Sequence, residues 1–201
     1  LYLVDCGEST FKAMFSRNEI YDYDNIVVLL THLHADHIGS LGSFLSFCKN
    51  VLDKKVLLAA EEDTIVNILD QSGVHTDKYN FTTDFKECEA DGLSIYVKRE
   101  SHATDMLCCG FIFECNGEKI YYSGDTSNVP SDILNAFLSG EIKTMYQECT
   151  FLDTDSTSHF SLKKLCEIIP YEERQRVYCM HLGDDIDDDI VKAGFRVPKV
   201  V

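Results

Sequence analysis

Short apolar runs alternate along the chain with longer stretches whose apolar residues recur at helical spacing. The apolar runs are rich in branched residues and predict buried strands at residues 1–5, 25–30, 55–60, 93–99, 109–115, 118–123, 143–147 and 176–180, with a short last strand at 195–197. The stretches with helical spacing predict helices at residues 8–17, 38–50, 61–70, 131–138, 162–169 and 184–193. This alternation of strands and helices is typical of α/β layering.

Turn and cap residues set several of these boundaries. Asn116-Gly117 lies between two apolar runs and predicts a tight β-hairpin. Ser131 and Ser161 are the expected N-caps of the two helices that follow them. Residues 74–92 mix aromatic and polar side chains, and we expect them to form a loop.

The length of the chain fits one domain with a sizeable core. Its 201 residues are 45% hydrophobic and 26% charged, which is ordinary globular composition. No internal repeat or linker-like tract divides it, so we expect a single domain over residues 1–201. The first residues already form a predicted strand and no Met precedes them, so we expect the domain to lack its first strands at the N-terminus.

The charge of the chain bears on its partners. It carries 34 acidic and 18 basic residues, for a formal net charge of −16. Such a surface repels long polyanions, so we do not expect a long nucleic acid as a partner. A small anionic substrate is still compatible, because bound metal ions would offset the negative charge locally.

Cysteine usage and hydropathy bear on the compartment. The nine cysteines are odd in number, include no C-x-x-C pair and mostly lie in apolar runs, as Cys179 does. We interpret them as reduced core residues of a cytoplasmic protein. The sequence shows no signal peptide and no apolar run that approaches the ~18 residues of a membrane span, so we expect no membrane partner.

The run from Thr31 to His37 is the strongest chemical signal in the sequence. It holds His32, His34, Asp36 and His37 within six residues, between a predicted strand and a predicted helix. Alternate side chains of extended backbone point the same way, so the first two histidines can bind one ion. The chain then turns, and the last two can reach a second ion. Neutral imidazole and carboxylate groups suit zinc, and also iron or manganese.

Other ligand-capable residues also follow predicted strands. His102, Asp125 and His181 each lie just beyond a strand end, where ligands can converge. Asp5 ends the first strand and has two readings that the sequence leaves open. It can orient a ligand histidine from behind, or it can be a solvated turn residue. His159 likewise is either a catalytic residue or simply the residue at the entry to a helix.

The order of these motifs resembles that of the metallo-β-lactamase-fold hydrolases. The matching segments span nearly the whole chain and are Val4-Asp5-Cys6-Gly7, the run from Thr31 to His37, Ser101-His102, Ser123-Gly124-Asp125-Thr126 and Met180-His181-Leu182. The resemblance implies a four-layer αββα sandwich, in which two mixed β-sheets lie face to face with helices outside. The later segments are most similar to the phosphodiesterase branch, which includes ribonuclease Z-like and cyclic-nucleotide phosphodiesterase relatives.

The resemblance also implies a role for each candidate residue. His32, His34 and His102 would hold a first metal; Asp36, His37 and His181 would hold a second; and Asp125 would bridge the two. The ions would be two divalent metals, with Zn²⁺ expected first and Mn²⁺ or Fe²⁺ as alternatives. They would produce a bridging hydroxide that attacks the substrate. Asp36 and His159 are the candidate catalytic residues, and His159 would contact phosphate or protonate the leaving oxygen.

The substrate class follows from the branch and from what the chain lacks. A tRNA-processing ribonuclease of this branch carries a long arm that binds tRNA, and the 64 residues between His37 and His102 contain no inserted Gly-rich or basic segment of that kind. We therefore expect a small phosphodiester as substrate, and a homodimer is one option for the assembly. The alternatives are a thioester, lactone or β-lactam hydrolase with the same metal pair, or a non-catalytic metal-containing sensor or binding protein.

Overall fold

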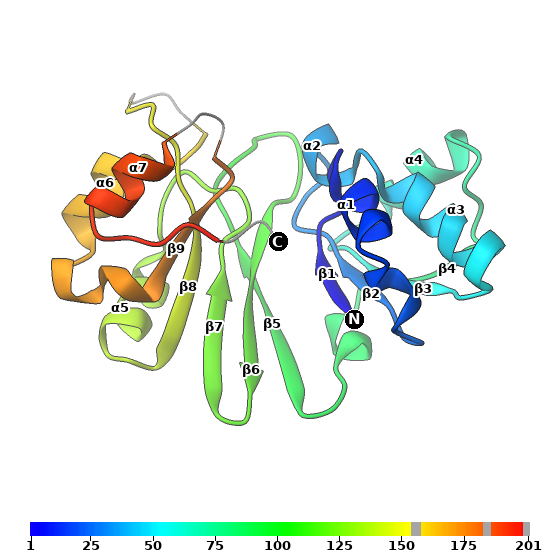
Figure 1. Cartoon of the computed structure of the whole chain (residues 1–201), viewed down its shortest axis with the longest axis horizontal. Helices are drawn as coiled ribbons and strands as arrows, with labels where there is room; N and C mark the ends of the chain where they lie inside the picture. Colours follow the sequence, from blue (N-terminus) through cyan, green and yellow to red (C-terminus); the bar gives the residue numbers. More distant parts are fainter. Residues whose placement is uncertain (154–157, 183–185, 199–201) are drawn as a thin grey trace. The chain divides into compact units, whose positions relative to one another are not determined.

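The computed structural model of the chain describes residues 1–153, 158–182 and 186–198 (Figure 1). It contains two compact units, Leu1–Glu89 and Ala90–Val201, which are described separately below. The expectation of one domain over residues 1–201 stays a prediction. Residues 184 and 185 of the last predicted helix lie outside the described residues.

The first unit has a sheet of four parallel strands with helices packed on it. The strands lie in the order β1-β2-β3-β4 and are β1 (Tyr2–Val4), β2 (Val27–Leu29), β3 (Val56–Ala59) and β4 (Tyr79–Thr82). The helices are α1 (Thr10–Ser16), α2 (Ala35–Ile38), α3 (Leu41–Leu52) and α4 (Thr64–Gln71), with 3₁₀ turns at Glu19–Tyr21 and Phe85–Cys88. The core joins Val28 and Leu58 of the sheet to Phe44 and Leu45 of α3 and Ile65 of α4.

Two features of this unit differ from the sequence prediction. The single helix predicted at 38–50 is two helices, because the Ser40 N–H donates to the Cys6 carbonyl oxygen at 3.1 Å instead of continuing the helical ladder. The predicted loop at 74–92 contains β4. Its partner β3 lies more than twenty residues earlier, so local periodicity gives no sign of the pairing, which is parallel.

The second unit has a mixed sheet of five strands in sequence order. These are β5 (Leu93–Arg99), β6 (Cys109–Cys115), β7 (Glu118–Tyr122), β8 (Ile142–Glu148) and β9 (Val177–Met180). The first three pair antiparallel and the last three pair parallel. Helices α5 (Ser131–Leu138), α6 (Leu162–Ile168) and α7 (Asp187–Lys192) accompany the sheet, with a 3₁₀ turn at Tyr171–Arg176. The mixed pairing expected for both sheets is therefore present in the second, whereas the described ladders of the first are parallel.

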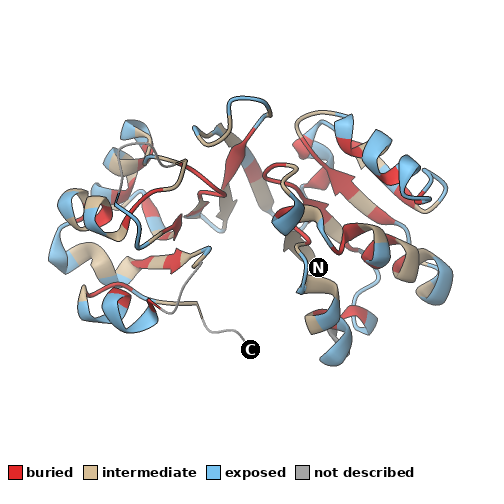
Figure 2. Cartoon of the chain, turned by 90° about the horizontal axis from the view of Figure 1, so that it is seen from above, coloured by how far each residue is buried: buried red, intermediate tan, exposed pale blue. Residues whose placement is uncertain are grey.

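The core of the second unit lies between its sheet and its helices. Tyr121 and Met145 of the sheet pack with Phe137 of α5, Leu165 of α6 and Ile190 of α7, and all five are buried. Figure 2 shows that buried positions concentrate on the strands and that exposed positions concentrate on the outer sides of the helices. Burying each large apolar side chain of this kind stabilises the fold by roughly 1.5–3 kcal/mol.

Local signals in this unit are partly confirmed. Asn116 and Gly117 have φ values of 53° and 79°, as expected of the residues in a tight hairpin turn with positive φ. Ser161 is the N-cap of α6, and its hydroxyl accepts from the Lys164 N–H at 3.2 Å. Ser131 is not a cap: the N-cap of α5 is Pro130, whose carbonyl accepts the first helical hydrogen bond.

Cysteines and helix lengths complete the fold. All nine cysteines are free, and seven of them are buried. Among the described residues, no helix has the length and apolar character needed to cross a membrane.

Candidate metal-binding and catalytic residues

Four candidate residues lie on the segment that connects β2 to the start of α3. His32 follows the strand, and His34 is the N-cap of α2 with extended backbone at φ −63° and ψ 150°. Asp36 and His37 lie within the single turn of α2 itself. The helical turn thus redirects the chain after His34, as the sequence predicts.

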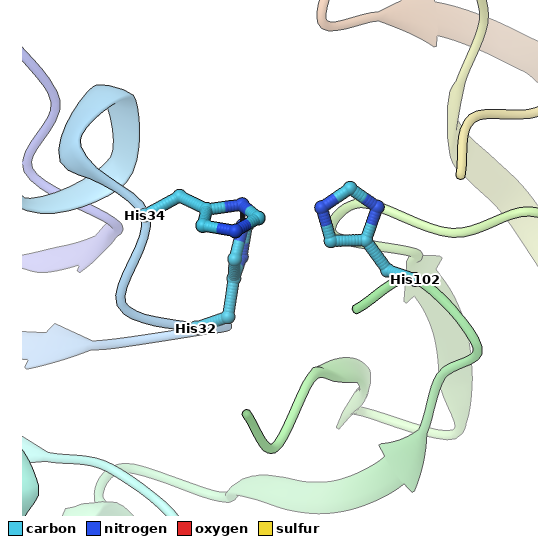
Figure 3. A group of neighbouring side chains, drawn as sticks. All are labelled: His32, His34 and His102. Atoms are coloured by element: carbon cyan, nitrogen blue, oxygen red, sulfur yellow. Dashed lines mark hydrogen bonds between the residues drawn. The ribbon is translucent and has the colours of Figure 1, made fainter. Parts of the chain in front are cut away.

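The rings of His32 and His34 meet edge to face after β2. Figure 3 shows them converging from this segment, and it also labels His102, which belongs to the second unit. The distance from His32 Nε2 to His34 Nδ1 is 2.9 Å. When two nitrogens bind the same zinc ion, each at about 2.0–2.1 Å, the distance between the two nitrogens is similar to this one. The pair therefore fits a shared divalent ion.

The Asp5 carboxylate contacts two residues of the run from Thr31 to His37. Its carboxylate accepts from the Thr31 N–H and the Thr31 hydroxyl, both at 2.8 Å, and lies 2.8 Å from His37 Nδ1. Since a carboxylate only accepts, Nδ1 of His37 carries the proton and Nε2 is the nitrogen that can bind an ion. The structure therefore supports the orienting role for Asp5. Asp5 adopts a left-handed backbone conformation, with φ 61°.

Gly7 allows the turn after β1 to approach α2. A Cβ at this position would lie 2.1 Å from the Asp36 carbonyl oxygen, which no side chain allows. The close approach is held by the Cys6 N–H, which donates to the His37 carbonyl at 2.8 Å, and by the Ser40 hydroxyl, which donates to the Gly7 carbonyl at 2.5 Å. The backbone under Asp36 and His37 therefore depends on a glycine.

Asp125 is the centre of the candidate residues in the second unit. It follows β7, is 3% exposed and has Oδ2 3.7 Å from His102 Nε2 and 3.5 Å from His181 Nε2. His102 Nδ1 donates to the Ser158 carbonyl at 2.9 Å, so Nε2 is again the nitrogen available to an ion. His181 follows β9 and has a left-handed backbone with φ 58°.

Glu148 is the functional candidate that the sequence prediction missed. It ends β8, is fully buried and contacts His159 Nδ1 and the Thr126 N–H. Its Oε1 also lies 3.6 Å from His181 Nδ1. His102, Asp125, Glu148 and His159 each offer one ligand atom, and these atoms all lie within 4.8 Å of one another. The rule that found Asp125, an acidic residue just after a strand, would have found Glu148 too.

His159 is positioned by this carboxylate as well as by its place before α6. Its ring stacks on that of His181 with centroids 5.5 Å apart, and its Nδ1 lies 3.9 Å from Asp125 Oδ2. Helix entry alone does not require a buried carboxylate on the ring. The catalytic role of His159 stays a prediction.

A second carboxylate, partly buried, lies next to this group. Glu100 accepts from the Tyr121 hydroxyl at 2.5 Å and from the Thr126 hydroxyl at 3.1 Å. Burial raises the pKa of Glu100 to about 7, against the lowering effect of both hydroxyl donors. Burial first, and the Glu100 carboxylate second, raise the pKa of Tyr121. The sequence prediction gave no role to either residue.

Each unit thus brings together its own share of the predicted residues. The first holds His32, His34, Asp36 and His37 on one segment. The second gathers His102, His159 and His181 around the buried carboxylates of Asp125 and Glu148. That the two sets serve one site stays a prediction.

The fold is that of known metallo-β-lactamase-fold proteins. YhfI from Bacillus subtilis, a metallo-β-lactamase-fold protein, superposes with a TM-score of 0.73 at 19% identity, covering 98% of this chain and 82% of that one. A diphosphatase from the PhnP family gives 0.72 at 17% identity, with coverage of 98% and 76%. The human short-form tRNase Z gives 0.64 at 19% identity, with coverage of 90% and 81%. The α/β class and the expected fold are therefore confirmed.

Sequence comparison gives the family. An anti-Pycsar protein Apyc1 of Bacillus phage BSP38 is 28% identical over 218 residues, which cover 96% of this chain and 81% of the relative. The protein of the same name from Paenibacillus harenae is 24% identical over 198 residues, with coverage of 92% and 79%. The family model described as anti-Pycsar protein Apyc1 matches residues 1–197. This chain therefore belongs to the anti-Pycsar protein Apyc1 family.

Proposed function

We propose that this protein is a metal-dependent hydrolase of small phosphodiesters. The observation that carries the proposal is the buried Glu148 carboxylate, which holds the His159 ring beside Asp125. An imidazole held in this way by a carboxylate can deliver a proton to an oxygen that leaves from phosphorus.

The proposed site uses the residues of both units. His32, His34 and His102 would hold one divalent ion, Asp36, His37 and His181 the other, and Asp125 would bridge. The donor set of imidazoles and carboxylates fits Zn²⁺, and also Mn²⁺ or Fe²⁺. When bound, the ions would supply a hydroxide nucleophile at neutral pH and neutralise negative charge on the phosphoryl oxygens.

His159, oriented by Glu148, would supply the proton that the leaving group needs. Hydrolysis adds water across one P–O ester bond, and the departing alkoxide oxygen needs a proton. With Nδ1 of His159 donating to Glu148, the proton for that oxygen would be held at Nε2. Glu148 keeps the ring in this orientation and stabilises its cationic form before transfer. Asp36, whose Oδ2 lies 3.7 Å from His37 Nε2, remains a proposed ligand and catalytic residue.

Charge and family together limit the proposed substrate. A net charge of −16 disfavours long polyanions but leaves small anions compatible with a site that holds two cations. The phosphodiesterase branch that the motifs resemble includes cyclic-nucleotide enzymes, so we propose a cyclic mononucleotide as the natural type of substrate. Its hydrolysis would also be the means by which this chain acts against Pycsar, the target stated in its relatives' names.

The test is a substrate panel with the zinc-loaded protein. Bis-p-nitrophenyl phosphate and purine and pyrimidine 3′,5′-cyclic monophosphates are compared with a thioester, a lactone and a β-lactam. We expect turnover of the phosphodiesters alone. Turnover of a thioester, lactone or lactam in preference would assign the protein to another hydrolase class. Tight binding of a cyclic nucleotide without turnover would make it a sensor.

The role of His159 has its own test. We expect His159→Ala to keep the bound metals and to lower phosphodiester turnover by ~10²–10⁴, which is the usual effect of losing a general acid. His75→Ala is the matched control, because His75 is an exposed histidine paired with Asp70 in the first unit. Elemental analysis measures the bound metals, and initial rates on the same preparation measure the turnover. An unchanged rate would remove His159 from the mechanism.

A further inference from the structure

A series of buried and partly buried hydrogen bonds runs from the core of the second unit to the turn that carries Asp125. It begins at Tyr121 of β7, which is fully buried and donates its hydroxyl to Glu100 Oε1 at 2.5 Å. The other oxygen of the same carboxylate, Oε2, accepts from the Thr126 hydroxyl at 3.1 Å. Glu100 thus links the middle of the sheet to the residue directly after Asp125.

Thr126 is held from two sides. Its hydroxyl lies 3.1 Å from Glu100 Oε2 and 2.9 Å from the Asn128 carbonyl oxygen, while its backbone N–H donates to Glu148 Oε2. The other oxygen of Glu148 contacts His159 Nδ1. A shift of Thr126 would therefore move Asp125 and would also remove a donor from the carboxylate that holds His159.

The polar groups in this series of hydrogen bonds are costly to remove from water unless they hydrogen-bond to one another. A buried hydroxyl or carboxylate without a hydrogen-bond partner costs about 1–3 kcal/mol, so each link constrains the position of the next. Residues that act on a metal through its ligands typically change metal affinity or activity by about 10–100-fold when they are removed. Asp125 is the proposed bridging ligand, which makes its turn the most sensitive point of the site.

We propose that Tyr121 and Glu100 are positioning residues: through Thr126 they fix the Asp125 turn and the Glu148–His159 pair. The inference rests on the proposed function for its effect on turnover, but its effect on metal binding can be read without a substrate.

The experiment removes one hydroxyl at a time. Tyr121→Phe keeps the buried ring and deletes the donor to Glu100, and Thr126→Val deletes the second donor but keeps the backbone N–H. The matched control is Tyr79→Phe: Tyr79 is also a buried tyrosine, and its hydroxyl has no hydrogen-bond partner among the described residues. Thr126→Ser restores a hydroxyl at the second position.

Zinc affinity is measured on the metal-free proteins by competition with a chromophoric chelator, and kcat and KM are measured at saturating zinc. We expect Tyr121→Phe and Thr126→Val each to weaken zinc binding by about 10-fold or more and to lower kcat by about 10-fold with KM within about twofold. Tyr79→Phe and Thr126→Ser should match the wild type in both.

The outcomes separate the two proposals. If the wild type binds zinc but hydrolyses no phosphodiester, the proposed function fails, and the zinc affinities of the variants still decide the positioning roles. If the wild type is active while Tyr121→Phe retains wild-type zinc affinity and kcat, the positioning inference fails alone. A loss shared equally by Tyr79→Phe would reduce the effect of Tyr121 to general core stability and would also overturn the inference.

Discussion

Replacing Gly7 by alanine tests whether the close approach between the turn after β1 and helix α2 is needed to hold Asp36 and His37 in place. The new Cβ would lie 2.1 Å from the Asp36 carbonyl oxygen and 3.2 Å from its carbonyl carbon. Ordinary carbon–oxygen contacts begin at about 3.3 Å, so the two backbones must separate by about 1 Å. Both contacting atoms belong to the backbone, so no side-chain rotation can relieve the overlap.

The expected cost follows from what that separation breaks. The hydrogen bond from the Cys6 N–H to the His37 carbonyl and that from the Ser40 N–H to the Cys6 carbonyl span this contact, at 2.8 and 3.1 Å. Losing them costs about 1 kcal/mol each, and the remaining overlap costs about 1–3 kcal/mol. We expect Gly7→Ala to lower the free energy of unfolding by about 3–5 kcal/mol and to displace Asp36 and His37 from their proposed metal.

Urea unfolding of the metal-free protein and elemental analysis of the zinc-loaded protein measure these two effects. Gly42→Ala is the matched control, since it lies in α3 of the same unit and its Cβ would meet only side chains, the nearest being Val74 Cγ2 at 3.3 Å. Its gain in helix propensity keeps the expected change within about 1 kcal/mol of the wild type. Equal stability and equal zinc content for the two variants would refute the reasoning.

Three further predictions concern the second unit. Asp125→Ala should lose one or both metals because Asp125 is the proposed bridge, and two ions per chain in elemental analysis would contradict this. Arg174→Ala should lower the free energy of unfolding in urea by about 2–4 kcal/mol without changing zinc affinity. The reason is that the guanidinium donates to three carbonyls, those of Cys166, Ile169 and Ala193. Arg174→Lys should recover only part of the loss. Burial raises the folded pKa of Glu100 to about 7 from 4.5, so its protonated form favours folding. Its contribution is fully present below about pH 4.5 and is lost as the pH rises to about 7, up to about 3 kcal/mol in the metal-free protein. Glu100→Gln should flatten that part of the profile, and an unchanged slope would contradict it.

Local patterns were enough to predict much of the fold. The strand at Leu93–Arg99 and the turn at Asn116-Gly117 are correct because alternation and positive φ are encoded by neighbouring residues. The break between α2 and α3 was not predictable, because Ser40 leaves the helical ladder for a carbonyl that lies 34 residues earlier. Strand β4 likewise depends on a parallel partner far along the chain.

The residues of the candidate site also differ in how well the sequence predicts them. The residues from His32 to His37 are dense enough in sequence to be predicted as ligands without a structure. Glu148 was not predicted as functional, although it follows a predicted strand as Asp125 does. Glu100 was not predicted because a single glutamate after a strand resembles many surface glutamates. Only the fold shows that Glu148 is buried, that Glu100 is partly buried and that both carboxylates contact Thr126.

The left-handed backbone at Asp5 has a consequence for protein engineering. Glycine adopts positive φ without steric cost, so Asp5→Gly would relieve backbone strain of the order of 1 kcal/mol. The same substitution would remove a buried carboxylate that accepts from the Thr31 N–H, the Thr31 hydroxyl and His37 Nδ1, and each lost partner costs about 1–3 kcal/mol. Placing glycine at positive-φ positions, a common way to raise heat resistance, should therefore lower it at Asp5.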